Sequence, residues 1–372
     1  MIEYRISNNE GVSMYTSTPR LEIYPDRIQE NARAVINLCH EHGVQVACVT
    51  KVMSAHPSLI HALELGGADM IADSRITNLR TVSNVGLEIP IMLLRIPAPS
   101  RAADIVRHCD ISLNSSIYTM VKLSEAAQML NIQHKVIIMI DVGDLREGVW
   151  PNNALEVVRS TASLPNLEVI GLGANLACYG GVIPTVENMQ MLIEIRDRCR
   201  KATGLALETI SGGNSSSLPL LASGKMPKEI NHLRIGEAIT LGRNVLDRSP
   251  WPGTRQDTMR IVAEIVEVEY KPSIPIGERG QDAFGGYTEF VDRGIRKRAI
   301  CNLGRQDIVV DGIEPEDPGI IVLGGSSDHL VLDVEESSTA LKVGDEVAFT
   351  PGYGALLAAT TSPYVQKVVI RG

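Results

Sequence analysis

The sequence is poor in aromatic side chains, which make up 4% of its 372 residues, and it contains only six cysteines. The cysteines form no C-x-x-C pair and mostly lie inside apolar runs, so we expect reduced, largely buried thiols in a cytoplasmic protein. Basic residues are not in excess, and the formal net charge is -9. This charge argues against nucleic acid as a general partner, because phosphate backbones are bound by basic surfaces.

Long apolar runs are also missing. The longest, near 136–140, has the length of a strand, so no membrane span is predicted. The first nineteen residues, MIEYRISNNEGVSMYTSTP, lack the basic segment and apolar stretch of a signal peptide. What the chain does have is a 44% share of apolar residues beside 21% charged ones, which is enough for a packed core.

From about residue 44 to 241, short apolar runs alternate with amphipathic stretches. We predict strands at 44–51, 68–74, 89–95, 110–115, 135–141, 167–177, 205–211 and 232–241. Helical patterns occupy 116–130, 187–203 and, ahead of the first strand, 25–43. Near-continuous apolar strands indicate a parallel sheet that is buried on both faces. Eight such units predict an α/β fold, a (β/α)8 TIM barrel. An open doubly wound sheet is the alternative, which the absence of a G-x-G-x-x-G motif after the first strand disfavours.

The sequence pattern changes after about Trp251, where Gly, Pro and the alternating pattern of strands replace helical periodicity. We therefore predict an N-terminal extension at 1–18, the barrel at 19–250 and a C-terminal β-domain at 251–372. The strand-like segment 19–24 is a candidate to pair with the β-domain.

Polar side chains follow the predicted barrel strands at the end where such barrels carry their functional groups. Lys51 ends the first strand, Arg146 follows the fifth, Asn175 lies near the end of the sixth, and Arg234 lies on the eighth. The alternative for each is a solvated charge or a rim salt bridge.

A Gly/Ser-rich segment, SGGNSSSLP at 211–219, follows the seventh predicted strand. Its glycines let the backbone approach an anion, Ser215 and Ser216 offer hydroxyl donors, and the next helix begins with unpaired N–H groups. An ordinary flexible connection is the alternative. A phosphate site and a lysine on one rim together suggest pyridoxal 5'-phosphate, which Lys51 would hold as a Schiff base.

At this point the chain resembles the alanine racemase family of pyridoxal-phosphate enzymes. VACVTKV resembles that family's lysine strand, SGGNSSS its phosphate loop, LRIGEAI its pyridine-arginine strand, and PGYGALLAATTSPYVQKVV its C-terminal tyrosine segment. Within the family, GANLACYGG and SGGNSSSLP resemble the ornithine and basic amino-acid racemases more than the alanine racemases. The resemblance covers about 19–372. It implies a homodimer whose active sites are completed across the interface by the β-domain.

The resemblance also implies roles for individual residues. Lys51 would hold the cofactor and move the proton on one face of the substrate Cα, and Arg234 would face the pyridine nitrogen. A cation there disfavours ring protonation, which favours racemisation over transamination. Arg146 would bind the ring hydroxyl or the substrate carboxylate. The phosphate would be held by Ser215, Ser216, Gly236 and Tyr353.

Two positions depart from the family pattern. Asn175 stands where alanine racemases carry a histidine beside the ring, and Ala55 stands where they carry a tyrosine four residues after the lysine. Both changes would alter the surroundings of the cofactor.

Racemisation needs a proton donor on each face of Cα. For the second face we favour Tyr287, in FGGYTEF, although a tyrosine with a pKa near ~10 needs a nearby cation to act as a base. The position that matches the family's catalytic tyrosine is occupied by Arg305. Other candidates are Cys301, Asp307, Ser326, Asp328 and His329.

The prediction is therefore an amino-acid racemase, acting on ornithine or another basic amino acid. A lyase of the D-serine dehydratase or D-threonine aldolase type is the alternative, and those relatives bind a metal through a C-terminal His/Cys or His/Asp pair. Asp328 and His329 are adjacent, so on a strand their side chains would point oppositely, and we predict no metal site. A non-enzymatic cofactor carrier would resemble the barrel alone, and the β-domain argues against it.

Overall fold

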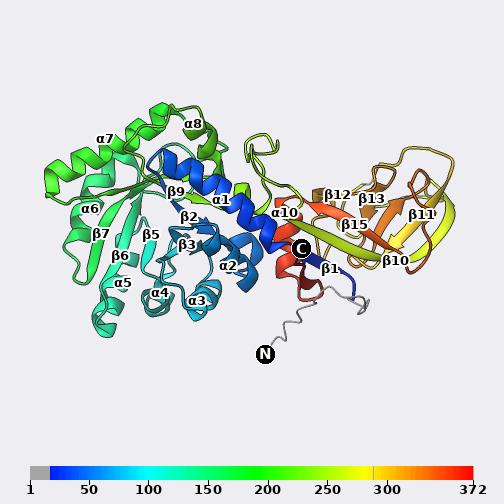
Figure 1. Ribbon diagram of the computed structural model, residues 1–372, viewed down its shortest axis with the longest axis horizontal. Helices are drawn as coiled ribbons and strands as arrows, with labels where there is room; N and C mark the ends of the chain where they lie inside the picture. Colours follow the sequence, from blue (N-terminus) through cyan, green and yellow to red (C-terminus); the bar gives the residue numbers. More distant parts are fainter. Residues whose placement is uncertain (1–16, 288, 372) are drawn as a thin grey trace. The chain divides into compact units, whose positions relative to one another are not determined.

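The computed structural model describes residues 17–287 and 289–371 (Figure 1). The chain divides into two compact units, one comprising 26–256 and the other 17–25 together with 257–371. The predicted extension at 1–18 lies outside the described residues, apart from residues 17 and 18. The sequence-based division groups 19–24 with the barrel, whereas in the structure these residues pair with strands of the β-domain and belong to that unit.

The larger unit is a closed barrel of parallel strands, as predicted. Its strands follow in the order β2 (Gln45–Val49), β3 (Met70–Asp73), β4 (Ile91–Leu93), β5 (Ile111–Asn114), β6 (His134–Met139), β7 (Leu167–Gly173), β8 (Thr209–Asn214) and β9 (His232–Ile235). Pairing of β9 with β2 closes the ring. The predicted (β/α)8 fold is therefore confirmed.

Helices lie outside the barrel strands in Figure 1. They are α1 (Pro25–Glu41), α2 (Pro57–Leu65), α3 (Ile76–Val85), α4 (Ala102–His108), α5 (Ile117–Leu130), α6 (Ala154–Ala162), α7 (Val186–Thr203), α8 (Leu218–Ala222) and α9 (Glu237–Thr240). Local sequence sets their ends. Helix α7 begins with a capping box between Thr185 and Asn188, and it ends at Gly204, whose φ of 74° is a left-handed conformation.

The barrel interior is filled by alternate residues of its strands. The apolar cluster there comprises Ala47, Val49, Met70, Ala72, Met92, Ile111, Leu113, Ile137 and Met139. Strands β7 and β8 lie close together because Gly171 has no side chain, and a Cβ at this position would lie 1.9 Å from the carbonyl oxygen of Thr209.

Strand β8 runs from Thr209 to Asn214, whereas the prediction placed it at 205–211. Because the strand ends three residues later than predicted, Gly212 and Gly213 belong to it and not to a loop. Gly212 packs so closely on Ile230 that a Cβ would lie 2.4 Å from the isoleucine side chain, and Gly213 has a φ of 113°. The predicted loop at 211–219 is thus reduced to a short 3-10 turn at Ser215–Ser217, followed by α8.

The smaller unit is built on an eight-stranded sheet. In the order β12 (Ile313–Pro315), β15 (Glu346–Pro351), β10 (Met259–Pro272), β11 (Ile295–Cys301), β14 (Leu330–Asp333) and β13 (Ile321–Gly325), each strand is antiparallel to the next. Strand β1 (Arg20–Ile23) pairs with β10 and with β16 (Gln366–Val369). Helix α10 (Tyr353–Thr361) was not predicted, because its sequence is apolar almost throughout and gives no amphipathic pattern.

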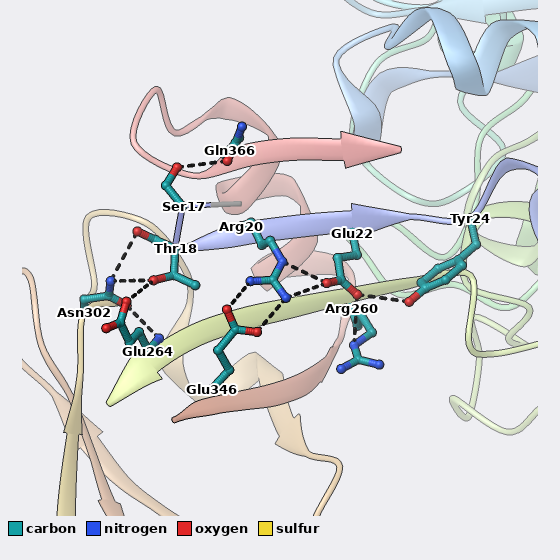
Figure 2. A network of polar contacts seen from close by, with 10 residues as sticks. All are labelled: Ser17, Thr18, Arg20, Glu22, Tyr24, Arg260, Glu264, Asn302, Glu346 and Gln366. Atoms are coloured by element: carbon teal, nitrogen blue, oxygen red, sulfur yellow. Dashed lines mark hydrogen bonds and ion pairs between the residues drawn. The ribbon is translucent and has the colours of Figure 1, made fainter. Parts of the chain in front are cut away.

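Strand β1 is attached to this sheet by a polar network that Figure 2 shows. Arg20 is buried, and its two terminal nitrogens donate to both carboxylate oxygens of Glu346 at 2.6 and 2.7 Å, while its Nε donates to Glu22 at 2.8 Å. Glu22 also accepts from the hydroxyl of Tyr24 and forms an ion pair with Arg260. The bidentate geometry gives one fixed position to a charged side chain that would otherwise cost free energy to bury.

Beside this network, the hydroxyl of Thr18 donates to Glu264 on β10 at 3.1 Å and accepts from the amide of Asn302 at 2.9 Å. Ser17 donates to Gln366 on β16. The start of the described chain is thus tied to β10, to β16 and to the residue that follows β11. Among the described residues, no helix is both long and apolar enough to cross a bilayer.

We expect Arg20→Met to lower the free energy of unfolding by about 2 kcal/mol, because Glu22 would stay buried without its main cationic partner. The control is Lys122→Met, which removes the exposed ion pair with Glu125 and should cost less than about 0.5 kcal/mol. Guanidinium denaturation followed by circular dichroism measures both. Equal, small losses in the two variants would contradict the assigned role of Arg20.

Candidate active site

Lys51 lies two residues beyond β2, as the first residue of a 3-10 turn (Lys51–Met53). The turn is anchored by Thr50, whose buried hydroxyl donates to the carboxylate of Asp73 at 2.7 Å. After it, Ser54 and Ala55 have left-handed φ values of 49° and 54°. The chain therefore turns sharply at the strand end, and the lysine side chain stays exposed at the carboxyl end of the barrel.

Glu237, the first residue of α9, lies close enough to Lys51 for the two charges to interact. Burial raises the pKa of the Glu237 carboxyl, and this is opposed by Arg248, which donates to it, and by the charges of Arg243 and Lys51. The carboxylate therefore links the lysine turn to the end of β9.

Arg234 is buried inside the barrel. It pairs in register with Ala47, a member of the interior cluster, so its side chain points inward. One terminal nitrogen donates to the hydroxyl of Ser211, and the other donates to the carbonyl of Ala174 at 2.7 Å. Burial lowers the pKa of the guanidinium to about 10, which leaves it charged at neutral pH.

Ser211 and His232, both buried, extend the hydrogen-bond network that begins at Arg234. The Nδ1 atom of His232 lies 2.7 Å from the Ser211 hydroxyl, and its Nε2 atom lies 3.4 Å from the sulfur of Met70. Burial, reinforced by the positive charge of Arg234, lowers the pKa of His232 to about 3, so the imidazole is neutral.

Asn175 follows β7 and contacts Arg234 from above the strand end. Its Oδ1 accepts from Asn214 Nδ2 at 3.2 Å and from Arg234 at 3.5 Å, which fixes the orientation of the amide. Its Nδ2 is buried and has no hydrogen-bond partner among the described residues. A buried donor in this state is suited to a ligand acceptor.

The short turn after β8 presents a second donor of this kind. The backbone N–H of Ser216 is capped by Asn214 Oδ1 at 2.8 Å, whereas the Ser216 hydroxyl is buried and unpartnered among the described residues. Ser215 accepts from the N–H groups of Gly236 and Ala238 at 3.3 and 3.4 Å. The predicted residues Asn175, Ser215, Ser216, Arg234 and Gly236 are thus brought together on neighbouring strand ends.

Arg146 lies in the loop after β6. Its guanidinium donates to the sulfur of Cys178 at 2.8 Å and to the neighbouring Glu147. Both charges of this pair act on Arg234, so the loop lies near the same end of the barrel. Its side chain is 39% exposed and forms part of the surface there.

The remaining predicted residues belong to the other unit. Tyr287 lies in the segment between β10 and β11 and is 71% exposed. Tyr353 is the first residue of α10, not part of a strand as the sequence texture had indicated.

The alternative donors for the second proton lie at the end of β11, in the segment that follows it, and in the turn between β13 and β14. The thiol of Cys301 is buried, which raises its pKa to about 12 and keeps it protonated. Asp307 is also buried, and it accepts from the N–H of Gly304 and the hydroxyl of Ser362. Arg305 donates to the carbonyl of Gly325 at 2.8 Å, and its guanidinium lies over the ring of Phe284.

Asp328 and His329 do not lie on a strand, as had been expected, but in the turn between β13 and β14. Their side chains therefore do not point oppositely, and Asp328 Oδ1 lies 3.5 Å from His329 Nδ1. Hydrogen bonds from Ser327 and Ser326 lower the pKa of the Asp328 carboxyl. Within 17–287 and 289–371, His, Cys, Asp and Glu side chains form no group of three that could hold a metal ion.

Residues 23–244 match the family model described as alanine racemase, N-terminal domain. The chain is 44% identical over 350 residues to a lysine racemase of Thermotoga maritima, covering 94% of this chain and 98% of that protein. It is 42% identical over 353 residues to an ornithine racemase of Acetoanaerobium sticklandii, covering 95% and 99%. This chain belongs to the alanine racemase family.

Solved structures share the fold over nearly the whole chain. An alanine racemase from Streptomyces lavendulae superposes with a TM-score of 0.75 at 17% identity, covering 96% of this chain and 98% of that chain. A D-threonine aldolase from Filomicrobium marinum superposes with a TM-score of 0.74 at 15% identity, covering 96% and 91%. At such identities the likeness concerns the fold alone.

The alanine racemase family implies pyridoxal 5'-phosphate as the cofactor. The residues at the barrel end fit such a group. The Ser216 hydroxyl and the Asn175 amide are buried donors without partners among the described residues, and Arg234 adds a buried positive charge. Each suits a ligand that is rich in hydrogen-bond acceptors.

Ser211, Asn214 and His232 hold this site together and were not predicted as site residues. A signal for one of them existed, because His232 precedes Arg234 by two residues on a strand and must share its face. Ser211 was placed at the boundary between the seventh predicted strand and the loop, and Asn214 in the loop, so their register with β9 was not apparent.

The neutral state of the buried imidazoles predicts a loss of stability in mild acid. Burial lowers the pKa of His232 to about 3 and that of His134 to about 4, whereas an unfolded histidine titrates near ~6.5. Below that pH the unfolded chain binds protons that the folded chain does not, so stability falls, by about 2 kcal/mol per histidine at a pH of roughly 5.

This expectation is tested by measuring denaturation midpoints of the cofactor-free protein between about pH 8 and pH 5, the range in which an ordinary histidine titrates. His232→Asn removes one such group and should show a shallower decline than the wild type. Ser217→Ala, which removes a buried hydroxyl but no ionisable group, should keep the wild-type slope. Parallel slopes in His232→Asn and the wild type would contradict the assignment.

Proposed function

We propose that this protein is a pyridoxal-phosphate-dependent racemase that interconverts the L and D forms of a basic amino acid, ornithine or lysine. The observation that carries the proposal is the identity of 44% and 42%, over nearly the whole chain, to a lysine racemase and an ornithine racemase. The lyase alternative has no comparable support, since the aldolase and dehydratase structures are only 15–18% identical to this chain.

The phosphate of the cofactor is proposed to bind at the turn after β8. Ser216 would donate its hydroxyl, which has no partner among the described residues, and the neighbouring Ser215 accepts from the N–H of Gly236 at the start of α9. Backbone N–H groups at this turn add donors of the kind that phosphate oxygens accept. Tyr353 of the β-domain stays a prediction for the same group.

Arg234 is proposed to face the pyridine nitrogen, and its permanent charge supports this role. A guanidinium cannot give up a proton near neutral pH, so it donates to the nitrogen without protonating it. Asn175 would offer its free amide donor beside the ring. Arg146, at the more exposed edge, is proposed to bind the ring hydroxyl or the substrate carboxylate.

The bound cofactor supplies an electron-withdrawing ring that acidifies the Cα–H bond of the attached amino acid. Lys51 is proposed to hold the cofactor covalently and, when substrate has replaced it, to take or return the Cα proton at Nζ on one face.

A proton donor for the opposite face is still required. Tyr287 stays the prediction, and its exposed phenol is not engaged in packing within its own unit. A homodimer, in which the β-domain of one chain completes the active site of the other, is also proposed, because the family resemblance implies it.

The function is tested with single enantiomers of ornithine, lysine, alanine and serine in D₂O. We expect the antipode of ornithine or lysine to form with deuterium at Cα, and the purified protein to absorb near ~420 nm, as pyridoxal phosphate attached to a lysine does. Lys51→Ala should lose both. Lys135→Ala is the matched control, because this exposed lysine lies on barrel strand β6 well before its carboxyl end. Release of ammonia or a keto acid in place of the antipode would favour the lyase.

The second proton is tested by Tyr287→Phe. If the phenol serves one face, the variant should lose at least about tenfold more Cα deuterium exchange from one enantiomer than from the other. Tyr270→Phe removes another exposed phenol from the same hairpin and should leave the two rates matched. Small and equal losses in Tyr287→Phe would move the role to another residue.

A further inference from the structure

Ser211 and His232 are buried polar residues to which the proposed function gives no role. They are register partners on β8 and β9, and both are fully or almost fully buried. Polar groups in a barrel interior cost free energy unless each finds a partner, so their arrangement calls for a specific reason.

The chemistry of the three side chains dictates the direction of the hydrogen bonds. A guanidinium has only donors, so Arg234 must donate to the oxygen of Ser211. The Nε2 atom of His232 lies 3.4 Å from the sulfur of Met70, which can only accept, so the neutral ring carries its hydrogen on Nε2. Nδ1 is then an acceptor, and the single proton of the Ser211 hydroxyl is directed at it across 2.7 Å.

Arg234 forms no hydrogen bond with a carboxylate among the described residues, although Glu147 and Arg146 act on it through their charges, with opposite effects on its pKa. Its hydrogen-bond partners in the described part of the chain are all neutral: the Ser211 hydroxyl, the Ala174 carbonyl and the Asn175 amide oxygen. A carboxylate in any of these places would neutralise the charge that Arg234 presents to a ligand. The serine and histidine instead fix the guanidinium while leaving its charge unchanged.

We propose that Ser211 and His232 are positioning residues that hold the guanidinium of Arg234 against the pyridine nitrogen of the cofactor. This inference rests on the proposed function, since it assigns Arg234 to that nitrogen. Two hydrogen bonds form this relay: one joins His232 Nδ1 to the Ser211 hydroxyl, and the other joins that hydroxyl to Arg234. Without the hydroxyl, one terminal nitrogen of Arg234 loses its acceptor, and the side chain gains freedom to turn away from the ring.

The test compares cofactor binding with and without the ring nitrogen. Cofactor-free wild type, Ser211→Ala and Ser217→Ala are titrated with pyridoxal phosphate and with the analogue in which CH replaces the ring nitrogen, and apparent dissociation constants are read from absorbance. We expect Ser211→Ala to weaken pyridoxal phosphate about tenfold and the analogue less than about twofold, because only the former uses the oriented guanidinium.

Ser217→Ala is the matched control, because its hydroxyl is as buried as that of Ser211 but lies in the turn after β8 and donates to the Gly212 carbonyl. It should affect both cofactors alike. Ser211→Thr restores a hydroxyl and should recover most of the affinity. Equal losses for the two cofactors in Ser211→Ala would overturn the inference, since a merely structural serine would act on both.

His232→Leu gives a second route should Ser211→Ala fail to fold. It removes the acceptor at the far end of the relay and should weaken pyridoxal phosphate about threefold, again with no matching change for the analogue. An effect of the same size on both cofactors would contradict the relay.

The direction of the relay is tested on the cofactor-free protein by nitrogen NMR of the His232 ring. We expect a neutral ring, with hydrogen on Nε2 and an unprotonated Nδ1, at every pH from about 8 to about 6. This range includes ~6.5, the pKa of an ordinary histidine. A hydrogen on Nδ1 would overturn the relay as drawn. Failure of the wild type to bind pyridoxal phosphate would instead overturn the proposed function together with the role assigned to Arg234.

Discussion

A positive charge buried inside the barrel is the constraint around which the candidate site is arranged. Arg234 is almost fully enclosed, and a guanidinium removed from water must find acceptors for its N–H groups. The structure supplies them from β8 and from the segment that follows β7: the hydroxyl of Ser211, the carbonyl of Ala174 and the amide of Asn175. None of these acceptors carries a negative charge.

The same hydrogen bonds order the rest of the site. Asn175 is oriented by Arg234 and Asn214, and Asn214 in turn caps the backbone of Ser216. One connected set of side chains therefore joins the ring-facing arginine to the turn proposed for the phosphate. Two donors in this set, on Asn175 and Ser216, are buried and have no hydrogen-bond partner in the described part of the chain. Such pre-arranged donors bind a ligand without the cost of ordering them.

Most of the barrel could be read from the sequence, since apolar strands and amphipathic helices of ordinary length alternate eight times. The errors arose where local pattern and tertiary packing disagree. Gly212 and Gly213 are typical of a loop, yet both lie in β8 because close packing on Ile230 and a positive φ require glycine there. Helix α10 gave no periodic signal because its residues are apolar on all sides. Arg234 and the serine turn were found through their motifs, whereas Ser211 depends on strand register, which one sequence does not reveal.

Strand β1 gives the chain an unusual order of assembly. Its partners β10 and β16 lie more than two hundred residues downstream, so the barrel is, in topology, an insertion into the β-domain. During synthesis β1 therefore waits on the order of tens of seconds for the strands that pair with it. A chain that stops before Gln366 lacks β16 and leaves β1 without its parallel neighbour, although β10 is already present.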